Sequence, residues 1–299
     1  MDRRTLLALV TVQTLFGLLP VAGKLVFATF HPLALGAIRV SIAAVILVVV
    51  QHFLADRRID LRRDGIQVAV LALFGVVLNQ TLFVVGLEKT TTVNAVLIIT
   101  CIPVVTYAIA VFMGRETWGP RRLFGMLLAL LGVVYLIGLS SVSFGWDNAL
   151  GDILVFVNCF CFSLYLVLSK PLASKVNPLN LVAWQFVMAS AVMVPLGLWF
   201  GLLDQVQVAS SVDWWLVGYI IVGPTVGTYV LNATALRHVT SSTVAVFIYI
   251  QPLFTAIAAW FFLDERLTWK LLPAALLVFV GVGIVAWRSR VAAEAVPQE

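Results

Sequence analysis

Charged residues are scarce in this chain. Asp, Glu, Lys and Arg make up 11% of the 299 residues, whereas hydrophobic residues make up 62%. Because a soluble domain carries roughly a quarter charged residues, this composition excludes an ordinary soluble domain. It indicates that most of the chain is surrounded by lipid.

Cysteines and catalytic groups are also scarce. The three cysteines, Cys101, Cys159 and Cys161, lie in apolar runs without the spacing of metal ligands, so we interpret them as small apolar packing residues. No nucleophile–base pair, phosphate loop or metal-ligand cluster is evident, and the loops are too short for a soluble catalytic domain. We predict no catalytic residue, no metal and no cofactor. A membrane-embedded enzyme or a structural protein is the alternative of another class.

Long apolar runs fill the rest of the chain. A helix needs about 20 apolar residues to cross a hydrocarbon layer of about 30 Å. The runs are continuously apolar and do not alternate with a period of two, which favours helices over a barrel. Suitable runs lie near residues 5–25, 33–53, 66–87, 92–113, 121–139, 151–169, 179–201, 214–236, 241–262 and 270–287. The sequence therefore predicts an all-α membrane protein with ten transmembrane helices.

Basic residues are unevenly distributed between the connecting segments. If the N-terminus is cytoplasmic, most Lys and Arg residues fall in cytoplasmic segments, and only Lys24, Lys89, Arg266 and Lys270 fall on the other side. Cytoplasmic loops of membrane proteins carry such an excess, so we predict that both termini are cytoplasmic. This topology also accounts for the formal net charge of +5, and we therefore expect no nucleic-acid partner.

The second half of the chain repeats the first. Five residues of the first half match five residues of the second half at one constant offset in the sequence. They are Thr91, Pro103, Thr106, Glu116 and Gly132, which match Thr240, Pro252, Thr255, Glu265 and Gly281 in that order. Nearer the start of each half, Lys24 pairs with Lys170 and Arg39 pairs with Gln185. Because each copy has an odd number of spans, five, the second enters the membrane from the opposite side. The sequence thus predicts two inverted five-helix repeats, which in secondary transporters place the substrate site near the bilayer midplane.

Several motifs resemble a known family. They are GRETWGPRRLFGMLLALLGVVYLIG and its echo LDERLTWKLLPAALLVFVGVGIVAW, with GLEKTTTVNAVLIITCIPVVTYAIA and HPLALGAIR. The chain resembles the EamA-type transporters of the drug/metabolite transporter superfamily. The resemblance implies a first five-helix repeat over 1–140 and a second over 141–299, which ends in a short cytoplasmic tail. It also implies that spans one to four and six to nine surround a central cavity, with spans five and ten at the periphery.

Polar residues occur near the middle of several spans. Buried polar groups in lipid are costly unless they are satisfied, so they mark either a cavity or helix–helix contacts. Our candidates for substrate binding are Gln13, Asn79, Gln80, Asn158, Tyr165, Thr228, Tyr229, Asn232, Tyr249 and Gln251. An interhelical hydrogen bond explains each residue equally well when it is taken singly. The predicted cavity therefore depends on their shared depth.

Arg39 is the most distinctive candidate for substrate binding. It lies about 10 Å into its span from Pro32, at about 1.5 Å per residue, and no acidic residue lies at mid-span. A cation that faces lipid there costs at least about 2.5–3.5 kcal/mol. One interpretation is that Arg39 meets a substrate carboxylate or phosphate, or gates by binding carbonyl groups at helix ends. The other is a structural hydrogen bond to the backbone.

Two prolines and two glutamates occupy matched positions in the halves. Pro103 and Pro252 each remove a backbone donor in mid-span, so we expect a kink there, which serves either as a static bend or as a hinge. Glu116 and Glu265 begin short turns before spans five and ten. Because a carboxylate suits a helix N-terminus, we interpret both glutamates as structural.

The combined features predict a transporter of the bacterial inner membrane, monomeric or homodimeric, whose partners are the lipid bilayer and a small-molecule substrate. We expect export of small organic metabolites, such as amino acids, or of drugs by alternating access. The alternative is an importer or exchanger of an anionic metabolite, an organic phosphate or a nucleotide-linked compound, bound by Arg39. The lack of a mid-span carboxylate favours an uncoupled or exchange mechanism over cation/proton antiport.

Overall fold

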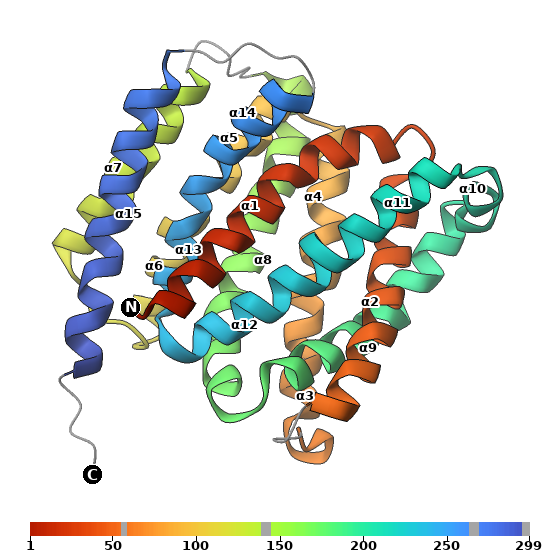
Figure 1. Ribbon diagram of the computed structural model, residues 1–299, viewed down its shortest axis with the longest axis horizontal. Helices are drawn as coiled ribbons and strands as arrows, with labels where there is room; N and C mark the ends of the chain where they lie inside the picture. Colours follow the sequence, from red (N-terminus) through yellow and green to blue (C-terminus); the bar gives the residue numbers. More distant parts are fainter. Residues whose placement is uncertain (55–58, 139–144, 263–268, 295–299) are drawn as a thin grey trace.

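The structure is a computed structural model that describes residues 1–54, 59–138, 145–262 and 269–294. Every regular element in these ranges is a helix, which confirms the all-α prediction for the described chain (Figure 1). The elements are α1 (Arg3–Val26), α2 (Pro32–Leu54), α3 (Leu61–Ala72), η1 (Leu73–Val77), α4 (Leu78–Glu88), α5 (Thr92–Ile99), α6 (Ile102–Phe112), α7 (Pro120–Ile137), α8 (Trp146–Lys175), α9 (Pro178–Trp199), α10 (Leu202–Val208), α11 (Ser211–Ile220), η3 (Ile221–Gly227), α12 (Thr228–His238), α13 (Ser241–Val246), η4 (Phe247–Ile250), α14 (Gln251–Phe262) and α15 (Leu271–Glu294).

Eight helical segments of the described chain are long and apolar enough to cross a membrane. They are Pro32–Leu54, Leu61–Glu88, Asn94–Phe112, Pro120–Ile137, Trp146–Lys175, Pro178–Trp199, Ser211–His238 and Ser241–Phe262. Leu271–Ala286 is a shorter apolar helix, and α1 has 24 residues. The sequence therefore located the apolar helices correctly, while the count of ten membrane crossings stays a prediction.

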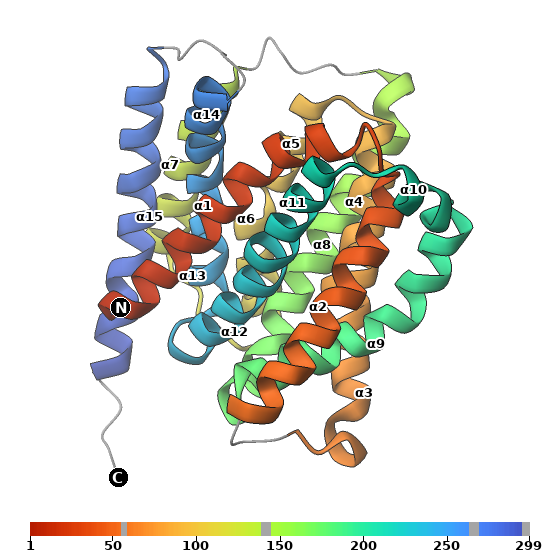
Figure 2. The same cartoon turned by 45° about the vertical axis from the view of Figure 1, so that its right-hand side comes forward.

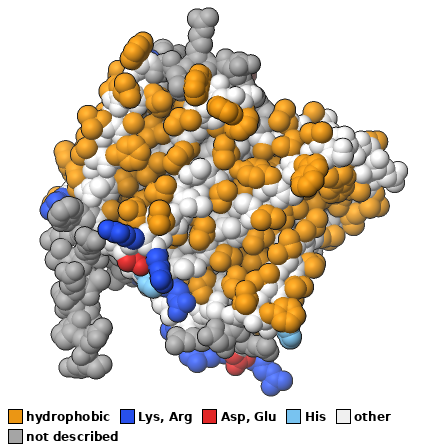
Figure 3. Space-filling model, in the orientation of Figure 1, with side chains coloured by type: hydrophobic (Ala, Val, Ile, Leu, Met, Phe, Trp, Pro, Cys, Tyr) orange, Lys and Arg blue, Asp and Glu red, His pale blue; other side chains and the backbone are white. Residues whose placement is uncertain are grey.

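The outer surface of the bundle is apolar. Phe112 is 92% exposed and Trp199 is 85% exposed. Many Leu, Val and Ile side chains are also exposed, to a lesser degree. Figure 3 shows hydrophobic side chains over most of one face and a group of Lys and Arg side chains in its lower part. In water such a surface would be unfavourable, because soluble proteins rarely expose large contiguous apolar patches. The surface suits hydrocarbon as its surroundings.

Two helical segments contain a wider π-helical turn at matched places. The segment Leu61–Glu88 is interrupted by η1, and Ser211–His238 is interrupted by η3. Gly75 lies in η1, and Pro224, which has no N–H to donate, lies in η3. A π turn leaves some main-chain carbonyl groups without their usual helical partner. Both interruptions can therefore accept hydrogen bonds from side chains.

Prolines coincide with two further departures from α-helix. Helix α5 ends at Ile99, and Pro103 is the second residue of α6. In the other half, the 3₁₀ segment η4 covers Phe247–Ile250, and Pro252 is the second residue of α14. Because proline cannot donate to the carbonyl group four residues earlier, the α-helical pattern fails in the preceding turn. A hinge role for these prolines stays a prediction.

Two helix pairs make the most extensive contacts in the bundle, α2 with α9 and α7 with α15. Helices α7 and α15 stand side by side at one edge in both views (Figures 1 and 2). A Cβ atom added to Gly132 would lie 2.8 Å from the carbonyl oxygen of Ala274, so this pair needs glycine for its close approach. Helix α8 packs against α4, α5 and α6, and α1 crosses α12 and α14.

Glu116 lies at a helix N-terminus, but not at that of the helix that follows it. Its Oε1 accepts a hydrogen bond of 3.0 Å from the backbone N–H of Ser242, and its Oε2 accepts one from the Ser242 hydroxyl. Arg122 forms an ion pair with the same carboxylate at 2.5 Å. Glu116 thus caps α13 in the second half of the chain. Glu265 lies outside the described residues.

Candidate functional site

Arg39 extends from α2 to the π-helical segment η3. Its Nε donates a hydrogen bond of 3.1 Å to the Thr225 hydroxyl. That hydroxyl in turn donates to the carbonyl oxygen of Ile220 at 2.8 Å, so the oxygen of Thr225 acts as an acceptor toward Arg39. The Arg39 residue is half-buried. In the described chain, the ion-pair geometry is met by Glu116 and Arg122 alone, so no described carboxylate neutralises Arg39.

Tyr229 of α12 lies next to this arginine. Its hydroxyl donates a hydrogen bond of 2.7 Å to the carbonyl oxygen of Gly75 in η1. Its ring meets Phe186 of α9 edge to face, with 4.9 Å between ring centroids. Tyr229 interacts electrostatically with Arg39 and lies close to the amide of Gln80. One tyrosine therefore connects the π turn of one half to the arginine bound at the π turn of the other.

Gln80 brings an unsatisfied amide to the same place. Its Oε1 lies 3.7 Å from the position of a Cβ atom built on Gly36, one turn before Arg39 on α2. Neither the oxygen nor the nitrogen of the amide makes a well-formed hydrogen bond within the described part of the protein, although both atoms are buried and the Tyr229 hydroxyl lies close by. Such a group costs about 1–3 kcal/mol unless something binds it. Gln80, Arg39 and Tyr229 therefore form one polar centre.

A second set of contacts joins α8 to α4, η1 and α9. The amide nitrogen of Asn158 donates to the main-chain oxygen of Asn79 at 2.5 Å. The ring of Tyr165 packs directly over Gly75, and its hydroxyl donates to Oε1 of Gln185 at 3.4 Å. These bonds explain Asn158 and Tyr165 as interhelical contacts. They do not show contact with a substrate.

The remaining candidates are spread more widely. Gln13, Asn232 and Tyr249 are buried, and each has a side-chain oxygen without a hydrogen-bond partner among the described residues. Thr228 donates to the carbonyl oxygen of Pro224 at 2.7 Å, which is a local bond in its own helix. Gln251 packs near Gly17 through its main-chain oxygen. The structure thus groups Arg39, Gln80, Tyr165 and Tyr229 more closely than it groups the rest.

Sequence reasoning missed two polar residues that bond the candidates: Thr225, which accepts from Arg39, and Gln185, which accepts from Tyr165. Thr225 was not distinguishable from other small polar residues in a span. Gln185 had a signal, because the repeat pairs it with Arg39. It is fully buried, and its Nε2 has no hydrogen-bond partner in the described ranges.

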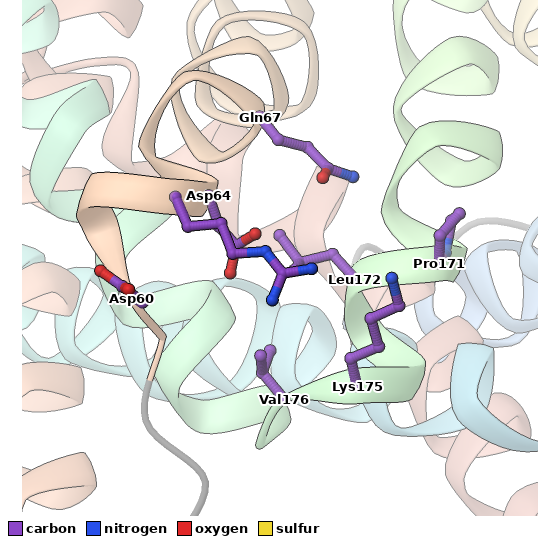
Figure 4. A pocket seen from close by; sticks show the side chains of 8 residues that line it. Asp60, Asp64, Gln67, Pro171, Leu172, Lys175 and Val176 are labelled. Carbon is purple, nitrogen blue, oxygen red and sulfur yellow. The ribbon is translucent and has the colours of Figure 1, made fainter.

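Two cavities lie away from this centre. One, of about 270 Å³, is lined by residues of α3 and of the end of α8, including Asp64, Gln67 and Lys175. Figure 4 shows these side chains facing one another between the two helices. The other, of about 370 Å³, is lined by α2 and α9 near His52 and Trp184. None of the residues that line these two cavities belongs to the predicted substrate-binding set.

The apolar helices around a buried polar centre define a multi-pass membrane protein. Residues 3–138 and 149–287 each match the model of the EamA-like transporter family. The chain therefore belongs to the EamA-like transporter family, as its sequence motifs predicted, and is a membrane transporter.

Relatives agree with this assignment, and one solved structure has a similar fold. An uncharacterized transporter of Archaeoglobus fulgidus is 30% identical over 204 residues, which cover 68% of this chain and 70% of that protein. An uncharacterized transporter of Methanothermobacter thermautotrophicus is 26% identical over 305 residues, which cover 95% and 86%. A crystal structure with 17% sequence identity superposes with a TM-score of 0.78 over 97% of this chain and 99% of that one. It shows the shared fold.

Proposed function

We propose that this protein is a secondary transporter that exports small organic metabolites, such as amino acids and related compounds, by alternating access. The observation that carries the proposal is the polar centre of Arg39, Gln80 and Tyr229 inside an apolar bundle, where buried polar atoms lack partners in the described chain. Polar groups that a membrane protein leaves unsatisfied in its interior are costly and are typical of a solute pathway.

The proposal includes ten membrane crossings in two inverted repeats. The eight long apolar segments supply eight crossings, and we assign the other two to α1 and α15. Matched π turns at η1 and η3, and matched interruptions before Pro103 and Pro252, support the repeat. The two family matches support it as well. In such folds the halves move against each other around a site between them.

The packing suggests which elements would move. Helices α2 and α9 occupy equivalent places in the proposed repeat and pack on each other. In addition, α2 contacts η3 and α9 contacts η1. The polar centre lies at these crossed contacts. We propose that α7 and α15 stay outside the pathway, because they pair at one edge of the bundle (Figure 2).

We further propose a location in the bacterial inner membrane with both termini in the cytoplasm. The excess of Lys and Arg in the segments assigned to the cytoplasm supports this orientation. The start of α1 and the end of α15 also lie toward the same end of the bundle (Figures 1 and 2).

Solute flux in sealed vesicles tests the proposal. Purified protein would be reconstituted and loaded with labelled amino acids, organic acids or lipophilic drugs, and release would be compared with protein-free vesicles. A Cβ atom at Gly75 would overlap the ring of Tyr165, whereas one at Gly65, in the same segment, meets nothing within 4 Å. We expect flux to fall in Gly75→Ala and to persist in Gly65→Ala. If the wild type moves none of these solutes, the proposed function is wrong.

A further inference from the structure

We propose that Arg39 and Gln80 together bind the carboxylate group of the transported solute. This inference rests on the proposed function and narrows it, because it assigns a charge and a chemical group to the substrate. The site would take a monoanionic organic acid or a zwitterion whose carboxylate enters the polar centre.

The first argument is the way in which Arg39 is held. Its Nε is engaged by Thr225 at 3.1 Å, which fixes the plane of the guanidinium group. No hydrogen bond to the two terminal nitrogens is found in the described chain. A guanidinium group offers its donors as a rigid fork that matches the two oxygens of a carboxylate. Arg39 is therefore oriented by one donor and leaves the others for a ligand.

The second argument is charge balance. Arg39 lies well inside a segment that crosses the membrane, where an uncompensated cation is expensive. The described acidic residues of the neighbouring segments lie at helix ends, as Glu88 does at the end of α4 and Asp213 does in the first turn of α11. The described chain thus supplies no anion at this depth. A bound anion would neutralise the charge.

The third argument is the adjacent amide of Gln80. Its buried oxygen and nitrogen make no well-formed hydrogen bond with a described residue. Its Oε1 lies beside Gly36, where the methyl group of Met193 also packs. The amide nitrogen can donate to a carboxylate oxygen. Tyr229 cannot be counted as a donor, because its hydroxyl already donates to Gly75. Its ring and that of Phe186 instead supply an apolar wall.

The fourth argument favours a carboxylate over a phosphate. A phosphate monoester carries nearly two negative charges at neutral pH, whereas the described polar centre contains Arg39 as its cation. The repeat-related position holds the neutral Gln185, which bonds Tyr165. A dianion would keep an unpaired charge in a poorly hydrated interior, which is costly. One cation matches one carboxylate.

Matched pairs of acids and amides test this inference. Short organic acids and amino acids would be compared with their primary amides, which have nearly the same shape but lack the charge. Binding would be measured on the purified full-length protein by solute-dependent thermal stabilisation and by competition for flux in vesicles. We expect at least one acid to bind about tenfold or more tightly than its amide, the range expected for a charge-assisted hydrogen bond.

Variants identify the residue responsible. Arg39→Gln should abolish the preference for the acid, and Arg39→Lys should restore part of it, because the charge returns without the fork. Glutamine is a suitable replacement for Arg39, because the repeat-related position already holds a glutamine, Gln185. Arg62→Gln, which removes an exposed charge from the start of α3, should behave like the wild type. Gln80→Leu should weaken acid binding and leave amide binding largely unchanged.

The outcomes separate the two proposals. If the wild type moves acids and amides equally well, and Arg39→Gln moves both, the carboxylate site is wrong and the proposed function stands. If the acid preference survives in Arg39→Gln, the carboxylate binds elsewhere and the inference is also wrong. If chloride alone stabilises the protein and no acid does so, Arg39 binds a simple anion and not the solute. If no solute is bound or moved, the proposed function is wrong.

Discussion

Glu116 offers the sharpest test of how the two halves of the chain are held together. Its side chain is only 3% exposed, and it receives the backbone N–H and the hydroxyl of Ser242 at the start of α13 as well as the guanidinium group of Arg122. Glu116→Ala removes all three interactions. Ser242 is fully buried, so its N–H group is left without an acceptor.

The expected loss of stability in Glu116→Ala follows from these three interactions. A lost acceptor at a helix N-terminus costs about 0.5–2 kcal/mol, and an orphaned buried donor costs about 1–3 kcal/mol. The two contributions overlap, because the same N–H group is involved in both. The side chain of Arg122 is 19% exposed, so water can hydrate part of its charge, and we count little for the ion pair. We expect Glu116→Ala to destabilise the protein by about 1–3 kcal/mol.

A double-mutant cycle in detergent would measure this loss by thermal unfolding. Ser242→Ala alone removes the hydroxyl but keeps the backbone N–H, so it should cost less than Glu116→Ala. The double variant should cost less than the sum, since both changes remove one shared bond. Arg122→Ala should cost less than about 1 kcal/mol. An effect of Glu116→Ala below about 0.5 kcal/mol, or strict additivity with Ser242→Ala, would refute the assignment of Glu116 as the cap of α13.

Three further substitutions have definite expectations. Gly132→Ala should push α7 from α15 and destabilise the protein by about 1–3 kcal/mol, whereas Gly283→Ala, whose Cβ atom would meet nothing within 4 Å, should change the melting temperature little. Asn158→Ala loses its bond to α4 at 2.5 Å and should cost about 0.6 kcal/mol, and no more than about 1.7, in thermal unfolding. Tyr229→Phe loses its bond to Gly75 at 2.7 Å and should reduce solute flux more than it reduces stability; unchanged flux would contradict its place in the centre.

The positions of the helices could be predicted because lipid imposes a simple rule. A segment must be apolar for about 20 residues to cross the hydrocarbon layer, and the described helices follow the apolar runs closely. Their ends were harder to predict. Helix α8 extends from Trp146 to Lys175, beyond the predicted span of 151–169. An α-helix can continue past the hydrocarbon boundary, where hydropathy no longer reports on it.

The depth of polar residues in the spans gave candidates for the site but did not specify their contacts. Arg39 could be placed inside a span by counting from Pro32, yet its acceptor, Thr225, comes from η3. A hydrogen bond between segments 186 positions apart in the chain depends on the crossing of two helices, which hydropathy does not specify. Glu116 shows the same limit, because its chemistry predicted a helix N-terminus and only the fold identified α13.

The prolines gave a local signal that the π turns lacked. A proline removes one donor wherever it lies in a helix, so interruptions near Pro103 and Pro252 could be expected from sequence. A π turn requires only one extra residue in a helical turn, which many sequences tolerate. Gly75 and Pro224 are compatible with such turns, but glycine and proline also occur in membrane helices for other reasons. The centre of the molecule is therefore where sequence reasoning was weakest.

In the proposed repeat, the two π turns η1 and η3 occupy equivalent positions. Gly75 and Thr225 each lie three residues before the α-helix that follows their π turn. In η3, Thr225 supplies the hydroxyl that holds Arg39. In η1, glycine leaves room for the ring of Tyr165, which supplies a hydroxyl to Gln185, the partner of Arg39 in the repeat. The hydroxyl that contacts Arg39 thus comes from a π turn, whereas the hydroxyl that contacts Gln185 comes from α8. Because Arg39 in one half corresponds to the neutral Gln185 in the other, the proposed repeat gives a centre with charge on one side only, as the proposed recognition of a single carboxylate requires.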